Sequence, residues 1–180
     1  MIIDEDIVAG GVTPFIITKL IERHERERQR YRLLHDYYMG DHCILNRRKR
    51  GKNVANNRIM CNHAKYITDM TQSYLVGNPV TYAVSDDYDI EAIKNAYLEQ
   101  DIPSVDSEIV KNMSIYGKAY ELIYADEKSK PRSVRLDPEH TFVCYSQSAF
   151  EKPLFAVYYY KKYDLDGYCT GSICRVYDES

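Results

Sequence analysis

The feature that most constrains the fold is a single change in the spacing of apolar residues, near Gly117 of the 180-residue chain. Before this point, apolar side chains recur every three to four residues, as on one face of a helix. After it they alternate, as they do in strands. A helical half followed by strands joined through short turns favours an α+β domain, with N-terminal helices followed by an antiparallel β-meander.

The first predicted helix has clear ends and a charged middle. Thr13 is placed to cap it, Pro14 suits its first position, and Gly40 follows its last turn. The middle, residues 22–30, contains no apolar residue, so we expect side-chain pairs four residues apart to support it. Such a helix bridges solvent or lies against a neighbour, and the simpler alternative is a solvated face.

Three more helices follow from apolar spacing and end signals. They cover about residues 62–75, a segment after Asp89, and the stretch from Pro103 to Gly117. Gly77 and Pro79 are expected to end the second of them. The alternation of residues 80–84 predicts a short strand before the third.

The second half is predicted to be strands and tight turns. Residues 119–125 and 133–136 form a predicted hairpin, and residues 141–145, 153–163 and 172–177 continue the meander. No segment follows to pair with the outer edge of the last strand. An open edge at a terminus is typical of a truncated domain, so we expect a fold that is incomplete at its C-terminus.

Charge divides the chain unevenly. Residues 1–58 hold twelve Lys and Arg against eight Asp and Glu, whereas residues 59–180 hold twelve against nineteen. We therefore predict two parts, an N-terminal helix with a basic loop (1–58) and a helical and β domain (59–180). The asymmetry suits an anionic partner or head-to-tail contact between copies of the chain. The 18 Tyr and absence of Trp are typical of interfaces, unless they reflect composition alone.

One basic run is the best candidate for contact with a partner. It consists of Arg47, Arg48, Lys49, Arg50 and Lys52. Clustered bases bind phosphates without regard to sequence and lose affinity as salt rises. The chain as a whole has a formal charge of −3, whereas dedicated nucleic-acid domains are basic overall. Contact with DNA, contact with another subunit and simple solvation therefore remain open for this loop.

Other chemistry finds little support. His42, Cys43, Cys61 and His63 supply four zinc-binding atoms, but adjacent ligands point apart on most backbones. The DLDG turn at 164–167 lacks calcium ligands at the first and last positions of a calcium loop. There is no phosphate-binding Gly-rich loop, no apolar run of the roughly 18–20 residues that span a bilayer, and no secretory signal. We therefore expect no cofactor, no membrane contact and no enzyme, and keep a zinc- or cysteine-dependent enzyme as the weakest alternative.

A series of sequence words resembles portal proteins of tailed double-stranded-DNA phages, of the type found in phages and prophages of Gram-positive bacteria. The main word, residues 56–82, carries Asn57, Arg58, Ile59, Asn62, Tyr66, Ile67, Asp69, Tyr74, Leu75, Gly77, Pro79 and Val80. The others are YYMGDH (37–42), SIYGKAYELIYADE (114–127), Pro138 with Phe142, and PLFAVYYY (153–160). They occur in the order typical of the family, over roughly residues 30–165.

The resemblance implies a structural protein. Portal subunits form a dodecameric ring at one capsid vertex, where they thread double-stranded DNA and contact terminase, scaffold or capsid proteins and head–tail connectors. It also implies residence in the virion, and in the host cytoplasm during assembly, with ATP hydrolysis left to terminase. Family members are much longer, so this chain is expected to be the N-terminal wing portion, with the channel helix, clip and crown following residue 180.

The resemblance also assigns structural roles to particular positions. These are Gly40, Asn57, Arg58, Asn62, Tyr66, Asp69, Gly77, Pro79, Tyr116, Gly117, Tyr120 and Glu121. The alternative from a different class is a small nucleic-acid-binding protein that uses residues 47–52.

Overall fold

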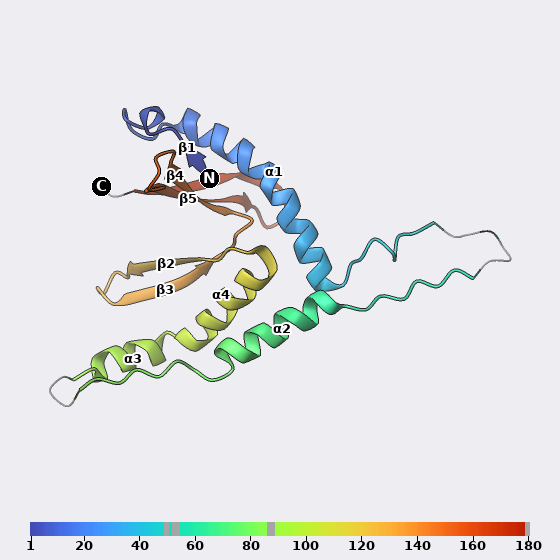
Figure 1. Ribbon diagram of the computed structural model, residues 1–180. Helices are drawn as coiled ribbons and strands as arrows, with labels where there is room; N and C mark the ends of the chain where they lie inside the picture. Colours follow the sequence, from blue (N-terminus) through green and yellow to red (C-terminus); the bar gives the residue numbers. More distant parts are fainter. Residues whose placement is uncertain (49–50, 52–54, 86–88, 179–180) are drawn as a thin grey trace. The chain divides into compact units, whose positions relative to one another are not determined.

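A computed structural model of the chain describes residues 1–48, 51, 55–85 and 89–178. Its helices are the short 3₁₀ helix η1 (Glu5–Ile7), α1 (Pro14–Met39), α2 (His63–Val76), α3 (Glu91–Glu99) and α4 (Ile102–Tyr116). Its strands are β1 (Ile2–Ile3), β2 (Tyr120–Ala125), β3 (Pro131–Leu136), β4 (Thr141–Ser146), β5 (Pro153–Tyr163) and β6 (Cys169–Tyr177), as shown in Figure 1. The predicted α+β class is confirmed, and all strands except the two-residue β1 follow the helices.

The ends of α1 lie where the sequence predicts them. The Thr13 hydroxyl accepts a hydrogen bond from the Ile16 amide at 3.4 Å, and Pro14 is the first helical residue. Gly40 follows the last turn with φ +87°, a conformation that glycine adopts without steric cost. In the charged middle, Glu25 pairs with Arg28 at 2.7 Å, three residues apart and not four.

The start of α2 and the end of α4 are also confirmed, whereas α4 begins at Ile102, before Pro103 and not after it. Asn62 caps α2 by accepting a hydrogen bond from the Lys65 amide at 3.0 Å. Gly117 ends α4 with φ +72°, and its amide donates to the Met113 carbonyl at 2.9 Å. Helices α2 and α4 lie against each other, and the Ser114 hydroxyl of α4 is 3.2 Å from the Thr68 hydroxyl of α2.

The strand predicted over residues 80–84 does not form. The described residues 79–85 contain no helix or strand, although apolar residues alternate along them. Alternation predicts a strand only where a neighbouring strand completes the ladder, and the described residues provide none here. The Tyr82 ring instead contacts the Tyr97 ring of α3, with centroids 5.0 Å apart.

The strands after Gly117 belong to two sheets, so the single continuous meander predicted from the sequence is wrong in this respect. Strands β2 and β3 form a two-stranded sheet, and the order in the other sheet is β1-β4-β5-β6. The break falls at a turn where the Asp137 carbonyl accepts from the His140 amide at 3.0 Å and from the Thr141 hydroxyl at 2.8 Å.

Strand β1 has no local signal in the sequence. It pairs in parallel with β4, placing Ile2 opposite Tyr145 and Ile3 opposite Ser146. The N-terminal ammonium group of Met1 donates to the Val143 carbonyl at 2.6 Å. At the other side of this sheet β6 pairs only with β5, so the predicted open outer edge is confirmed for the strands that the structure describes.

Compactness divides the described chain into two units. Unit 1 comprises Met1–Tyr31 and Leu136–Ser180, and unit 2 comprises Arg32–Arg135. These units rest on contacts and not on charge, so the predicted division into residues 1–58 and 59–180 stays a prediction.

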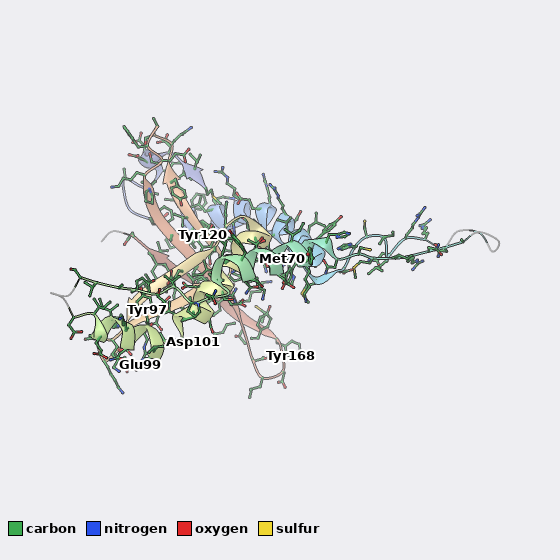
Figure 2. The ribbon with its side chains drawn as sticks, turned by 60° about the horizontal axis from the view of Figure 1, so that its bottom comes forward. Met70, Tyr97, Glu99, Asp101, Tyr120 and Tyr168 are labelled. Atoms are coloured by element: carbon green, nitrogen blue, oxygen red, sulfur yellow. The ribbon has the colours of Figure 1, made fainter. Side chains whose placement is uncertain are left out.

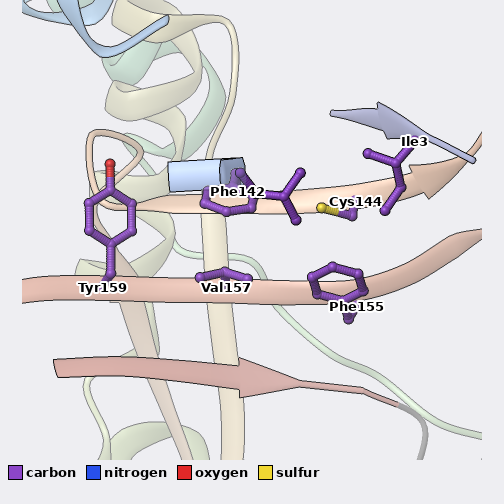
Figure 3. Close-up of a cluster of buried hydrophobic side chains, with 7 residues drawn as sticks. Ile3, Phe142, Cys144, Phe155, Val157 and Tyr159 are labelled. Carbon is purple, nitrogen blue, oxygen red and sulfur yellow. The ribbon is translucent and has the colours of Figure 1, made fainter. Parts of the chain in front are cut away.

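The core of unit 1 lies where α1 covers β4 and β5. Its buried apolar residues are Ile3, Leu20, Phe142, Cys144, Phe155, Val157 and Tyr159. Figure 3 shows how alternate side chains of β4 and β5 build this cluster. The alternation places every second residue of each strand on one face, as expected for a sheet with one buried side.

A buried polar pair adjoins this core. His24, 1% exposed, has its Nδ1 atom 2.9 Å from the Tyr159 hydroxyl. His24 belongs to the charged segment 22–30, for which the sequence left open a helix that bridges solvent, contact with a neighbour and a plain solvated face. A fully solvated face is wrong, because the His24 imidazole points inward, with its ring centroid 5.0 Å from that of Phe142.

Candidate functional site

The predicted contact residues lie in the segment that joins α1 to α2. They are Arg47, Arg48, Lys49, Arg50 and Lys52. Arg47 and Arg48 are exposed, whereas Lys49, Arg50 and Lys52 lie outside the described residues. The described parts of this segment contain turns but no regular helix or strand, as expected for a loop. Its two arms run beside each other in Figure 1.

Arg58 joins the two arms of this loop. Its guanidinium donates to the Leu45 carbonyl at 2.9 Å and also to the Arg47 carbonyl. A guanidinium suits this position because its planar fork presents several donors in a fixed geometry. The backbone that carries the exposed Arg47 is therefore held from the opposite arm.

Asn62 and Gly40 fasten the ends of the loop. The Asn62 side chain caps α2 with its oxygen, and its Nδ2 donates to the Tyr38 carbonyl near the end of α1 at 2.8 Å. A Cβ atom at Gly40 would lie 3.0 Å from the Met60 methyl and 3.1 Å from Asn62 Nδ2. Glycine is therefore favoured at residue 40 by its positive φ, and a larger side chain would also displace the ends of Met60 and Asn62.

Tyr38 connects this anchor to two helices. The ammonium groups of Lys65 (α2) and Lys111 (α4) each lie 5.8 Å from the centroid of its ring. Its hydroxyl is 3.4 Å from Asp69 Oδ1. Two cations near one aromatic ring and a carboxylate near its hydroxyl form a compact polar cluster. The sequence did not predict this cluster of Tyr38, Lys65 and Lys111. It indicated only the word YYMGDH (37–42), without a role for the Tyr38 ring.

Tyr116 and Gly117 also have structural roles. The Tyr116 ring stacks on the His35 ring, with centroids 6.5 Å apart and planes 5° apart. Gly117 then reverses the chain from α4 toward β2 with a positive φ. The pair joins the end of α1 to α4 and starts the hairpin.

Four other predicted positions are mainly exposed. Asn57, Tyr66 and Pro79 lie on the surface. Gly77 follows α2 in a right-handed helical conformation, and a Cβ there would overlap the Ser73 carbonyl oxygen. Glycine is therefore required at this helix end by contact with the preceding turn.

Tyr120 and Glu121 begin β2, beside an open cavity of about 490 Å³ in unit 2. Glu121 lines this cavity and accepts a hydrogen bond from the Ser133 hydroxyl. Burial, with a smaller effect of Glu121, raises the pKa of Asp106 in the same wall. The apolar part of the wall is formed by Tyr82, Ala92, Ile93, Ala96, Tyr97, Ile102, Ile123 and Pro131. Sequence reasoning missed the cavity because its walls come from five segments: the stretch before α3, and α3, α4, β2 and β3.

The zinc candidates do not gather into a site. Cys43 and Cys61 are exposed free thiols, and His42 Nε2 is 3.2 Å from the Tyr37 carbonyl oxygen. The described part of the chain contains no cluster of three or more His, Cys, Asp or Glu residues able to hold a metal ion. Nor does any helix among the described residues have the length and apolar character needed to cross a bilayer.

Comparison with known proteins gives two findings. A family model described as "Phage portal protein, SPP1 Gp6-like" matches residues 17–180. The portal protein of Bacillus phage SPP1 is 31% identical to this chain over 157 residues, which cover 81% of this chain and 30% of that protein. The chain thus spans less than a third of the length of this curated relative.

Proposed function

The chain belongs to the phage portal proteins of the SPP1 Gp6-like family, and from this premise we propose that it is part of a structural subunit of the portal ring. In this role, copies of the subunit assemble at one capsid vertex, and double-stranded DNA passes through the central channel during packaging and ejection. The residues described here form a wing portion of that subunit. Its action is mechanical, with no chemical step on the chain itself.

The observation that carries this proposal is the family match over residues 17–180. The geometry adds support, because positions of the matched words hold the architecture together. Asn62 ties α1 to α2, and Arg58 joins the arms of the basic loop. Gly117 turns α4 into β2. Such positions suit a scaffold in which element ends are fixed accurately.

The role implies partners and a location. We propose that the subunit contacts terminase, scaffold or capsid protein and head–tail connectors, and that it resides in the virion after assembly in the host cytoplasm. The direct test is electron microscopy of the purified native protein, together with immunolabelling of particles. Rings and a label at a single vertex are expected. A protein that stays monomeric and is missing from particles would sink the proposal.

A second candidate function is contact between DNA and the basic loop. It is favoured by the exposed Arg47 and Arg48 on a backbone that Arg58 clamps. Each phosphate contact contributes about −0.9 to the slope of log affinity against log salt. Replacing Arg47 and Arg48 by Ala should therefore lower the magnitude of the slope for duplex DNA by about 2. The exposed pair Lys161 and Lys162, replaced in the same way, is the matched control, and equal effects of both double variants would exclude a specific role for the loop.

A further inference from the structure

Helix α2 presents its apolar side to solvent and its polar side to its neighbour. Along one side run Tyr66, Ile67, Met70, Tyr74 and Leu75, which are 63%, 60%, 54%, 89% and 58% exposed. We name these five residues the α2 stripe. Their spacing places them on one broad face of the helix. Met70, near the middle of the stripe, is labelled in Figure 2.

The opposite side of α2 makes polar contacts with α4. Thr68, 4% exposed, faces the Ser114 hydroxyl at 3.2 Å. Gln72 Nε2 donates to the Ser107 hydroxyl at 2.6 Å. Helices of globular proteins normally turn their apolar side to the core and their polar side to water. The orientation of α2 is the reverse, so its apolar side is left for a partner.

The size of the α2 stripe fits a protein interface. Its exposed side chains present together about 650 Å², if each offers roughly 200 Å² when fully exposed. The largest apolar patch on a typical monomer covers about 300–600 Å². A standard protein–protein interface buries about 800 Å² on each partner. The stripe is thus comparable to the largest patches found on monomers and close to the area of one side of an interface.

The chemistry of the α2 stripe also fits an interface centre. It carries no charged residue, it contains two tyrosines and a methionine, and it follows the basic segment 47–58 in the chain. Interface centres are depleted of charge and enriched in these residue types. Along the chain, residues 1–58 have an excess of four bases and residues 59–180 an excess of seven acids. A division of charge of this kind suits contact between copies that pack head to tail.

From these observations we infer that the α2 stripe docks a second copy of the same chain, and that it forms part of the subunit contact in the ring. The inference rests on the proposed function, because a ring requires copies of one chain to meet through two different surfaces of each subunit. It goes beyond that function by naming the helix face, and the residues, that leave solvent on assembly.

The decisive experiment compares two methionines in the full native protein. Met70→Glu places a charge within the α2 stripe. Met113→Glu places it on α4, at a residue that is 56% exposed against 54% for Met70. Self-association is measured by sedimentation velocity over a range of concentrations, and circular dichroism checks that each variant is folded. We expect at least about tenfold weaker association for Met70→Glu, because a charge buried at an interface centre loses its hydration, and wild-type behaviour for Met113→Glu.

A second measurement needs no substitution and so does not depend on the folding of a variant. Mild peroxide converts exposed methionine to its sulfoxide at a rate set by access to the sulfur. In assembled wild-type protein Met70 should be protected several-fold relative to the dissociated subunit, whereas Met113 should oxidise equally in both states.

The outcomes separate the inference from the proposed function. If wild-type protein forms rings in which Met70 stays as reactive as in the free subunit, the inference is wrong and the portal role stands. If Met70 is already protected in the free subunit, another part of the same subunit covers the α2 stripe, and the inference is also wrong. If the wild-type protein never self-associates, the portal role itself fails.

Discussion

Unit 1 and unit 2 differ in where they place their apolar side chains. In unit 1, β4, β5 and α1 enclose a cluster in which Val157 and Cys144 are fully buried. In unit 2, among the described residues, Ile115 is buried together with the polar Thr68 and Asn112. Most exposed large apolar residues also belong to unit 2. A unit that buries its apolar surface gains that stabilisation within itself, whereas one that leaves it exposed gains stability when a partner covers it.

The largest effect on stability is expected from one of two phenylalanine substitutions within unit 1. Phe142 is 3% exposed and Phe150 is 93% exposed. Phe142→Ala should lower the free energy of unfolding by about 3–5 kcal/mol, because it leaves a cavity in the core. Phe150→Ala should change it by less than about 0.5 kcal/mol. Urea unfolding, with hydrogen exchange to assign the loss to β4 and β5, makes the measurement. Similar costs for both would show that unit 1 lacks the core described.

A somewhat smaller loss of stability is expected when the buried hydrogen bond between His24 and Tyr159 is removed. Tyr159→Phe removes the hydroxyl that bonds His24 and leaves the ring in place. A lost buried hydrogen bond costs about 1–3 kcal/mol, so the urea midpoint should fall. Tyr163→Phe, at a residue 60% exposed on the same strand, is the control and should leave the midpoint unchanged. An unchanged midpoint for Tyr159→Phe would mean that the pair contributes nothing to the stability of unit 1.

Alkaline pH should weaken unit 1 through two buried acids. Burial raises the pKa of the Cys144 thiol to about 11 from an ordinary value of 9.0. Burial, assisted by Glu27, raises that of Tyr31 to about 12 from 10.0. A raised pKa means that the folded state holds its proton longer than the unfolded state. This contribution to stability is therefore complete below pH 9 and is lost progressively as the pH rises toward 12.

Urea unfolding measured from pH 8 to 11.5 tests whether stability falls as the pH rises. The free energy of unfolding should decline above pH 9 in wild-type protein. The decline above pH 10 should be shallower in Tyr31→Phe, while Tyr66→Phe, at an exposed tyrosine, should follow the wild type. A wild-type curve that stays flat over this range would contradict the burial of both groups.

The smallest effect on stability, and a local one, is expected in unit 2. Arg58→Ala removes the bonds to the Leu45 and Arg47 carbonyls. Because these bonds are exposed, the free energy of unfolding should change by less than about 1 kcal/mol. Trypsin should nevertheless cleave the loop several-fold faster, since a released backbone enters the protease more readily. Arg26→Ala on α1 is the control. Equal cleavage rates in the wild type and in both variants would show that Arg58 does not hold the loop.

Local chemistry explains most of what the sequence predicted correctly. Pro14, Asn62 and Gly117 mark helix ends because each satisfies a requirement of the adjacent turn, whatever the rest of the chain does. The β2–β3 hairpin follows in the same way from its short turn. Features that depend on distant partners were missed. Strand β1 needs β4, and the extended residues 80–84 have no strand beside them among those described.

The candidate site was predicted less completely than the fold. The basic loop and the anchoring positions Gly40, Arg58 and Asn62 were identified from the sequence, but the cation–π cluster around Tyr38 was not. Helical spacing correctly placed Ile67, Met70 and Tyr74 on one face of α2. Spacing alone does not say whether such a face meets the core or a partner, because both require apolar side chains.

The interleaving of the two units has a consequence for the order of events on the ribosome. Ile2 and Ile3 are synthesised first, yet their partners Tyr145 and Ser146 emerge more than 140 residues later. Unit 2, Arg32–Arg135, is contiguous and is complete before that moment. At a rate of roughly 5–20 residues per second, the first strand waits about 7–30 s for its partner. A folded unit 2 shortens the loop that must close when that partner arrives, and so lowers the entropic cost of completing unit 1.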